Sequence, residues 1–260
     1  MTDTPSVTYA VADRVATITL ARPESRNVLN AESLSQLLAH LSSAASDDAV
    51  RVVVLTGEGR AFCAGADLRG GQPGADGFAS SGPQALVDVL TTMLDHPKPI
   101  IARVQGHVAG GGNGLVAAAD LAVAVETASF AFSEVRVGVA PAVISVVTLR
   151  RLNPAHAAEL LLTGERVSAT RAQEAGLLNA VVPDDALDAT VARWAGQLLL
   201  GGPEAVSRTK ELLRRVPEMA RDEAFAYTAE LSAALFSSAE AAEGMTAFLE
   251  KRPPSWAPAS

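Results

Sequence analysis

The chain has 260 residues, which suits one large domain or a core with a small appendage, and its residues are 48% hydrophobic but only 4% aromatic. A formal charge of −8 excludes a nucleic-acid-binding surface, because phosphate recognition needs a concentrated basic face. No apolar run reaches the length of a membrane span, so neither nucleic acid nor a membrane is an expected partner.

The first half of the chain predicts strands that alternate with helices. Two runs of β-branched residues meet at Ala12 and Asp13, the pattern of a β-hairpin. An amphipathic helix follows, with its apolar stripe at Leu34, Leu37, Leu38 and Leu41. Short strands are expected in VRVVVLTGEG (50–59), PIIARVQG (99–106), LAVAV (121–125) and ASFAF (128–132). This alternation predicts an α/β core with helices packed on sheets.

Two later regions differ from this pattern. Residues 69–83 are rich in glycine, serine and proline and lack periodicity, so we expect a loop, either an exposed insertion or a lid over a site. From Pro154 onward the pattern is nearly all helical, apart from a strand in LLNAVVP (177–183). We therefore divide the chain into a core, 1–195, and a helical region, 196–260, whose amphipathic helices are expected to contact other subunits.

The remaining composition bears on location and ligands. The N-terminus has no basic, apolar leader, which predicts a cytoplasmic protein. The single cysteine, Cys63, cannot form an internal disulfide, and the four histidines lack metal-ligand spacing, so no bound metal is expected. A small polyanionic ligand needs only a few local cations. The candidates for these are Arg22, Arg26, Lys251 and Arg252.

The most unusual stretch is QGHVAGGGNGLVAAAD (105–120), in which three consecutive glycines precede an apolar helical segment. Neither the Walker pattern nor a dinucleotide fingerprint fits, since Leu115 stands where the latter needs glycine. Close packing of the helix is one explanation. The other is an anion site, because a strand that leads glycines into a helix leaves unpaired N–H groups at the positive end of its dipole.

A second segment, GRAFCAGADL (59–68), has a related pattern, with small residues that would let an N–H group near Ala66 face a ligand. Two such donors that converge on one carbonyl oxygen form an oxyanion hole.

Four segments in this order resemble the enoyl-CoA hydratase/isomerase (crotonase) family: RAFCAGADL, GHVAGGGNGL, FAFSEVRVGVAP and LTGERVSATRAQEAGLLNAVV. The terminal GMTAFLEKRPP is also similar to the tail of that family, so the resemblance covers nearly the whole chain. It implies a crotonase-like spiral of ββα units, a C-terminal helical region that assembles trimers or dimers of trimers, and acyl-CoA thioester substrates. Coenzyme A is then part of the substrate, and no separate cofactor is expected.

The resemblance also assigns residues. The backbone N–H groups of Ala66 and Gly111 correspond to the family's oxyanion hole, which binds the thioester oxygen and stabilises an enolate. Contacts to coenzyme A are implied for Ser25, Arg26, Ala64, Asp67, Leu68, Phe248 and Lys251, the last of these from a neighbouring subunit.

Of the two glutamates that the resemblance to family hydratases implies, this sequence has only one. Hydratases of this family hold the attacking water between two glutamates; the second matches Glu134, but Gly114 stands at the position of the first. The neighbouring Asn113 can bind water but cannot accept its proton near neutral pH. One glutamate suffices to move a proton between the α- and γ-carbons, as in isomerases of the family, and it suffices for hydration if backbone groups help to hold the water. If the missing acid alone limits hydration, Gly114→Glu is expected to raise the rate.

Other polar residues rank lower. Cys63 is expected to be a buried apolar group, His107 to be structural, and Glu134 itself has Arg136 as a potential ion-pair partner. Ser145, in PAVIS after Pro141, stands where the family often has a second glycine pair; this departure alters either the acyl pocket or the helix start. The leading hypothesis is a single-glutamate enoyl-CoA hydratase. The alternatives are a 3,2-enoyl-CoA isomerase and a catalytically weak acyl-CoA-binding protein.

Overall fold

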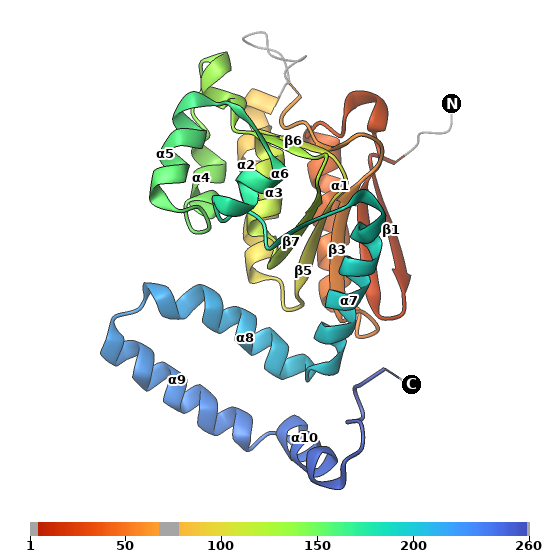
Figure 1. Ribbon diagram of the computed structural model, residues 1–260. Helices are drawn as coiled ribbons and strands as arrows, with labels where there is room; N and C mark the ends of the chain where they lie inside the picture. Colours follow the sequence, from red (N-terminus) through yellow and green to blue (C-terminus); the bar gives the residue numbers. More distant parts are fainter. Residues whose placement is uncertain (1–4, 68–77, 259–260) are drawn as a thin grey trace.

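The computed structural model describes residues 5–67 and 78–258 (Figure 1). Its strands are β1 (Val7–Ala12), β2 (Val15–Leu20), β3 (Val52–Gly57), β4 (Ala61–Cys63), β5 (Ile100–Val104), β6 (His107–Ala109), β7 (Leu121–Val125), β8 (Ser129–Ala131), β9 (Arg166–Ser168) and β10 (Ala180–Val182). Its α-helices are α1 (Ala31–Ser46), α2 (Phe78–Asp95), α3 (Gly111–Ala118), α4 (Ala142–Thr148), α5 (Pro154–Thr163), α6 (Ala169–Glu174), α7 (Leu187–Leu200), α8 (Pro203–Arg215), α9 (Arg221–Phe236) and α10 (Ala239–Glu250). Single 3-10 turns occur at η1 (Pro23–Ser25), η3 (Ser133–Val137), η4 (Asp184–Ala186) and η5 (Val216–Glu218).

The strands form two sheets. One has the order β1-β2-β3-β5-β7-β10, in which β1 and β2 are an antiparallel hairpin and the other pairs are parallel. The smaller sheet has the order β4-β6-β8-β9, with β9 antiparallel to β8. The chain alternates between them: β3, β5 and β7 each enter the large sheet, and the next strand, β4, β6 or β8, enters the small one. Each pair of strands is followed by a helix, so the core is the expected spiral of ββα units.

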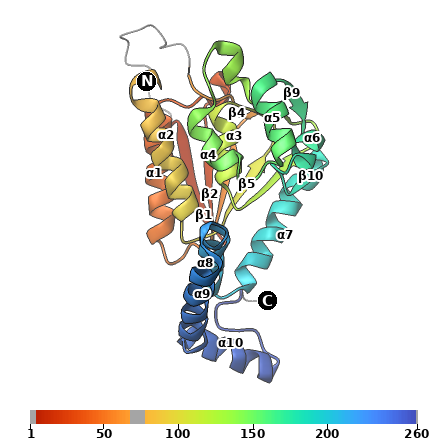
Figure 2. The same ribbon diagram turned by 90° about the vertical axis from the view of Figure 1, so that its left-hand side faces the viewer.

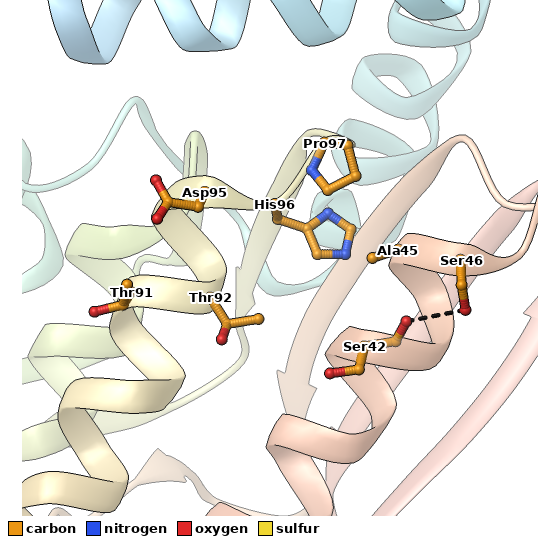
Figure 3. A pocket seen from close by; sticks show the side chains of 8 residues that line it. All are labelled: Ser42, Ala45, Ser46, Thr91, Thr92, Asp95, His96 and Pro97. Atoms are coloured by element: carbon orange, nitrogen blue, oxygen red, sulfur yellow. Dashed lines mark hydrogen bonds between the residues drawn. The ribbon is translucent and has the colours of Figure 1, made fainter.

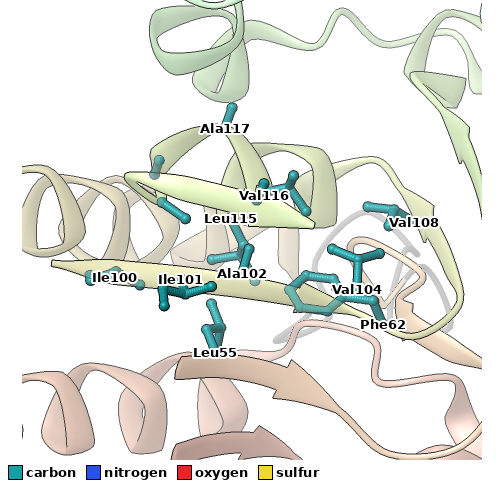
Figure 4. Close-up of a cluster of buried hydrophobic side chains, with 14 of the residues drawn as sticks. Leu55, Phe62, Ile100, Ile101, Ala102, Val104, Val108, Leu115, Val116 and Ala117 are labelled. Carbon is teal, nitrogen blue, oxygen red and sulfur yellow. The ribbon is translucent and has the colours of Figure 1, made fainter. Parts of the chain in front are cut away.

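The core lies between the sheets and their covering helices. Every residue of β3 is buried, as expected of a central parallel strand covered on both faces. Figure 4 shows Phe62 of the small sheet beside Val104 of β5, with Leu55 of β3 and Leu115 of α3 on opposite sides of β5; all four belong to one buried cluster. In Figure 2, α1 and α2 cover one side of the large sheet and α7 covers the other. The shortage of aromatic residues is therefore met by close packing of alanine, valine and leucine.

Most predicted elements are confirmed, including the hairpin, the α1 stripe and the caps. Ser168 accepts a hydrogen bond from the Arg171 amide at the start of α6, and Gly164 ends α5 in the left-handed conformation. The prediction of a loop over residues 69–83 is wrong in its last part, because α2 already begins at Phe78. The apolar face of α2, with Leu86, packs against the core, and such tertiary packing overrides the weak local helix propensity. Residues 68–77 lie outside the described residues.

Beyond the spiral, α8, α9 and α10 extend from the body as an arm (Figure 1). Phe225 of α9 is 69% exposed and Phe248 of α10 is 82% exposed. The division at residue 195 stays a prediction; that residue lies within α7, which continues to Leu200. Within the described part of the chain, no helix has both the length and the apolar composition that crossing a membrane requires.

Candidate functional site

One wall of the candidate site is the turn that follows β4. Gly65 has φ +87°, a conformation that favours glycine, and its carbonyl accepts a hydrogen bond of 2.7 Å from the Leu29 amide. The Asp67 amide donates to the Leu29 carbonyl at 2.9 Å, so Leu29 and Ala66 pair as a parallel bridge. Because both of these bonds lie on the Leu29 side, the N–H of Ala66 points to the opposite side of the segment. This half-buried amide is a hydrogen-bond donor available to a ligand.

The second wall is the start of α3, which is reached through β6 rather than directly from β5. Gly110 caps the helix with φ +50° and ψ −127°, and its amide donates to the Ala131 carbonyl of β8 at 3.1 Å. Gly111 is the first helical residue, so its amide has no acceptor within the helix and lies at the positive end of the dipole. Gly111 is half-buried, and its amide stays a predicted oxyanion donor.

The two walls are in direct contact. A Cβ atom on Gly65 would lie 3.0 Å from the Ala109 carbonyl oxygen and 3.3 Å from Gly110 Cα. Any side chain at position 65 would separate the β4 turn from the α3 turn. Glycine is therefore needed here for close approach as well as for its positive φ, and this approach places the turn that contains Ala66 against the start of α3, where Gly111 lies.

Glu134 lies beside the same turn. A Cβ atom on Gly110 would lie 3.6 Å from Glu134 Oε1, whereas Oε2 is buried and has no hydrogen-bond partner among the described residues. Burial raises the pKa of Glu134 above the ordinary glutamate value of 4.5. The ion pair with Arg136 does not form, because Arg136 Nε donates to the Thr163 carbonyl instead. One carboxylate oxygen thus lies beside the α3 turn, and a hydrogen bond from the Glu134 backbone amide to its own carboxyl opposes the pKa shift that burial causes.

The position of the missing acid is filled by packing. Gly114 is buried in α3, and a Cβ atom there would lie 2.6 Å from Cγ2 of Ile144, a residue of α4. Gly114→Glu alone therefore cannot test the missing acid cleanly, since the new side chain would collide with Ile144. Asn113 is fully buried and donates from Nδ2 to the Ala131 carbonyl at 2.8 Å, while its Oδ1 has no partner among the described residues. The Asn113 amide thereby ties the start of α3 to β8.

Four of the residues expected to contact coenzyme A, Ser25, Arg26, Ala64 and Asp67, lie beside this site. The Ala64 amide donates to the Arg26 carbonyl at 3.0 Å, which joins the η1 turn to the β4 turn. Arg26 is exposed, whereas Arg22 is paired with Glu32 at 2.8 Å, so of these two candidate cations Arg26 is the one left accessible. Leu68 lies outside the described residues.

Phe248 and Lys251 are not brought to this site within one chain. They belong to the end of the arm, and the segment after them is held near the β1–β2 turn, where Arg14 donates to the Trp256 carbonyl at 2.7 Å. That turn precedes β2, so it lies at the end of the large sheet opposite the site (Figure 1). Lys251 is exposed, whereas Arg252 is paired with Glu243 and Glu250.

Two other candidate residues have structural roles. Burial raises the pKa of the Cys63 thiol to about 12, and its Cβ lies 2.8 Å from where a Cβ on Gly112 would be, so it is a packed thiol and no nucleophile. His107 lies on the surface at the start of β6, with Nδ1 2.8 Å from Ser129 Oγ. Cys63 thus packs against both walls of the site, and the Gly65 amide donates to its Sγ at 3.5 Å.

A shallow cavity of about 540 Å³ lies elsewhere, between the ends of α1 and α2 (Figure 3). Its polar side chains include Ser46 and Asp95, and His96 forms its floor with Nε2 bonded to the Leu41 carbonyl at 3.1 Å. The loop that lines it leads into the start of β5. This cavity is thus at the end of the sheet away from Glu134.

Two glycine-containing turns in direct contact, with a carboxyl beside one of them, form a class of site that could present backbone amides and a proton-transfer group to one ligand. A model of the enoyl-CoA hydratase/isomerase family matches residues 11–258, and the chain belongs to this family.

Individual proteins agree with this assignment. The chain is 34% identical to a 2,3-dehydroadipyl-CoA hydratase of Escherichia coli K12, over 93% of this chain and 94% of that protein. It is 36% identical to a carnitinyl-CoA dehydratase of Citrobacter koseri, over 92% and 93%. A crystal structure of an enoyl-CoA hydratase from Mycobacterium smegmatis superposes with a TM-score of 0.91 at 36% identity, covering 97% of this chain and 99% of that one. The fold is thus the crotonase fold that the motifs predicted.

Proposed function

We propose that the protein is an enoyl-CoA hydratase that adds water reversibly to a 2-enoyl-CoA thioester with a single glutamate. The amides of Ala66 and Gly111 would bind the thioester oxygen, and coenzyme A would enter as part of the substrate. The observation that carries the proposal is Glu134, whose buried Oε2 has no partner among the described residues and whose other oxygen lies beside the α3 turn. A buried carboxylate oxygen without a partner is costly, which favours a functional role over a structural one.

In the proposed reaction, the Glu134 carboxylate takes a proton from water as the water oxygen bonds to the β-carbon. The electron pair of the double bond moves toward the carbonyl, and the resulting enolate oxygen accepts hydrogen bonds from the two amides. The protonated Glu134 then gives its proton to the α-carbon. One water is added and the carboxylate is restored. The elevated pKa of Glu134 suits a group that must both accept and return this proton.

The two named relatives support hydration over other reactions of the family. One is named for hydration of a 2,3-unsaturated CoA thioester and the other for a dehydration. Both reactions need an oxyanion site and a proton-transfer group, and Ala66, Gly111 and Glu134 supply these here.

A 3,2-enoyl-CoA isomerase is the second candidate, and the Gly114–Ile144 contact favours it. With isoleucine packed where a second acid would project, one carboxyl has to carry out all proton transfers. Moving a proton between the α- and γ-carbons needs no water and no second acid. The catalytically weak binding protein is the third candidate, and it predicts thioester binding without turnover.

The test compares the wild type with Glu134→Gln on crotonyl-CoA, whose conjugated-enoyl absorbance falls on hydration, and on a 3-enoyl-CoA, where that absorbance appears. We expect Glu134→Gln to lower hydration by about a hundred- to ten-thousand-fold, because it removes the proton-transfer group but not the amides. Glu126→Gln, an exposed change outside the site, is the matched control and should keep wild-type activity. Conversion of the 3-enoyl substrate alone would identify an isomerase. Thioester binding without either reaction would identify a binding protein.

We also propose that the chain forms a trimer or a dimer of trimers in which Phe248 and Lys251 contact the coenzyme A bound by a neighbouring copy. Their exposure and their distance from the site of their own chain support this arrangement. In a single chain, the apolar ring of Phe248 and the cation of Lys251 would both stay exposed at the end of the arm.

A further inference from the structure

Gly114 and Ile144 form a tightly matched contact between α3 and α4. A Cβ atom on Gly114 would lie 2.6 Å from Ile144 Cγ2 and 3.2 Å from Ile144 Cβ. It would also lie 3.5 Å from Leu90 Cδ1 of α2. All three residues are nearly or fully out of contact with solvent. The contact therefore leaves no room for even a methyl group at position 114.

Ile144 cannot easily move away from this contact. Its Cγ2 branches directly from Cβ, so it is fixed close to the α4 backbone, and a β-branched side chain has one strongly preferred rotamer in a helix. Val147, on the next turn of α4, is also buried. A side chain introduced at 114 would therefore have to displace α4 and not merely rotate a flexible group.

This packing adjoins the proton-transfer site. Gly110 and Gly114 are four residues apart, about one helical turn along α3. Glu134 Oε1 lies beside Gly110, and Ile144 lies beside Gly114. Glu134 and Ile144 thus pack against successive turns of one helix. A longer acidic side chain at 114 would start within one turn of the Glu134 carboxyl.

We propose that Ile144 restricts this site to a single carboxyl by steric exclusion. Its Cγ2 occupies the volume through which any side chain at position 114 would project. The inference rests on the proposed function where it concerns chemistry, since it assigns the number of acids that the reaction uses. Its packing component stands on the contact alone.

The packing component is tested by thermal unfolding of Gly114→Ala in three backgrounds. Alanine normally replaces a helical glycine with a gain in stability. In the wild type we expect a lower melting temperature, because the new methyl group meets Ile144. In Ile144→Ala, which removes Cγ2 and keeps only the Cβ contact at 3.2 Å, the same change should lower the melting temperature much less. Ile144→Val is the matched control, since valine keeps a branch at Cβ and should not relieve the contact.

A second control is Gly196→Ala, in the interior of α7, where a Cβ atom would meet nothing within 4 Å. It should raise the melting temperature equally in the wild type and in Ile144→Ala. The proposal is overturned if Gly114→Ala lowers the melting temperature as much in Ile144→Ala as in the wild type. It is also overturned if Ile144→Val relieves the loss as fully as Ile144→Ala does.

The chemical component compares Ile144→Ala with Gly114→Glu/Ile144→Ala by two assays. Hydration of crotonyl-CoA requires water activation, whereas exchange of the α-protons of butyryl-CoA in D₂O requires only one base and the oxyanion hole. We expect the double variant to hydrate about a hundred-fold faster than Ile144→Ala, the lower range for one added acid or base, with exchange unchanged. A folded double variant that hydrates no faster overturns Ile144 as the residue that limits the number of acids.

These outcomes are separable from failure of the proposed function. If Glu134 is not the proton-transfer group, wild-type exchange will be insensitive to Glu134→Gln, and the proposed function falls. The melting temperatures of the Gly114→Ala series still decide the packing role of Ile144 in that case.

Discussion

Lys210 and Glu134 are both withdrawn from solvent at opposite ends of the molecule, but they differ in their hydrogen bonds. Lys210 of α8 donates to Asp120 Oδ2 at 2.8 Å, to the Met93 carbonyl at 3.0 Å and to the Lys98 carbonyl at 3.3 Å. Asp120 in turn accepts from the Ile100 amide at 2.7 Å. These groups lie where β5 and β7 begin. Glu134 Oε2, near the other end, has no partner among the described residues.

The difference separates a structural charge from a functional one. Burial lowers the pKa of Lys210, and the nearby Asp120 opposes that shift, so the ammonium stays paired and joins the arm to the body. Burial raises the pKa of Glu134, and no neighbouring cation opposes it. A charge with three acceptors is fixed in place. The Glu134 carboxyl accepts a hydrogen bond only from its own backbone amide, and its Oε2, which has no partner among the described residues, is left to interact with whatever enters the site.

The largest expected effect comes from removing the structural charge. Lys210→Met should lower the free energy of unfolding by about 1 to 3 kcal/mol, because the half-buried Asp120 and two backbone carbonyls lose their donor. Folded protein should keep its turnover rate. Urea unfolding and an activity assay on the same sample would measure both.

Two further variants serve as controls for this contrast. Lys210→Met/Asp120→Asn removes both charges and should recover much of the lost stability. Glu134→Gln should give the opposite result to Lys210→Met, with stability unchanged or higher and activity lost. Equal loss of stability in Glu134→Gln would remove the distinction between the two charges.

A smaller effect is expected in the pH dependence. Glu134 acts in the proposed reaction as a carboxylate, which is the form that increases as pH rises through its pKa. Because burial raises that pKa, the acid limb of kcat/KM should lie above the ordinary glutamate value of 4.5. A pH profile on crotonyl-CoA measures the limb, and the residual activity of Glu134→Gln should lack it. A limb at or below 4.5 would place Glu134 in a solvated environment.

The smallest effect concerns the arm. Lys251→Ala should raise KM for a CoA thioester by up to about five-fold, the range for an exposed ion pair of up to about 1 kcal/mol. KM for the matching N-acetylcysteamine thioester, which lacks the phosphates, should not change. Sedimentation should give a mass of three or six chains. A monomer with wild-type KM would contradict the contribution from a neighbouring copy.

The sequence predicts local features of this molecule better than contacts between distant segments. The glycines at 65 and 110 can be predicted because positive φ and close approach leave their mark on a short motif. Glu134 is recognised from its place in such a motif. The start of α2 at Phe78 was missed because glycine, serine and proline there disguise a helix that packing stabilises.

Contacts across the fold left weaker signals. Gly114 and Ile144 are 30 positions apart, and the departure in PAVIS was visible but could not be paired with Gly114 without the structure. Lys210 and Asp120 are 90 positions apart, and each looks like an ordinary surface residue in its own helix or loop. A single sequence contains no local pattern that indicates which distant residues contact each other in the fold.

Because the chain alternates between two sheets, the residues of the proposed site come from successive turns of the ββα spiral. Each such turn is here called a coil. The coil ending in β4 supplies the amide of Ala66, the coil ending in β6 supplies that of Gly111, and the coil ending in β8 supplies Glu134. A change confined to the third coil can exchange the acid–base group while the two amides stay in place. Evolution can therefore diversify the reaction by replacing one connection, residues 133–148, and directed evolution of new activities is best aimed at the same segment.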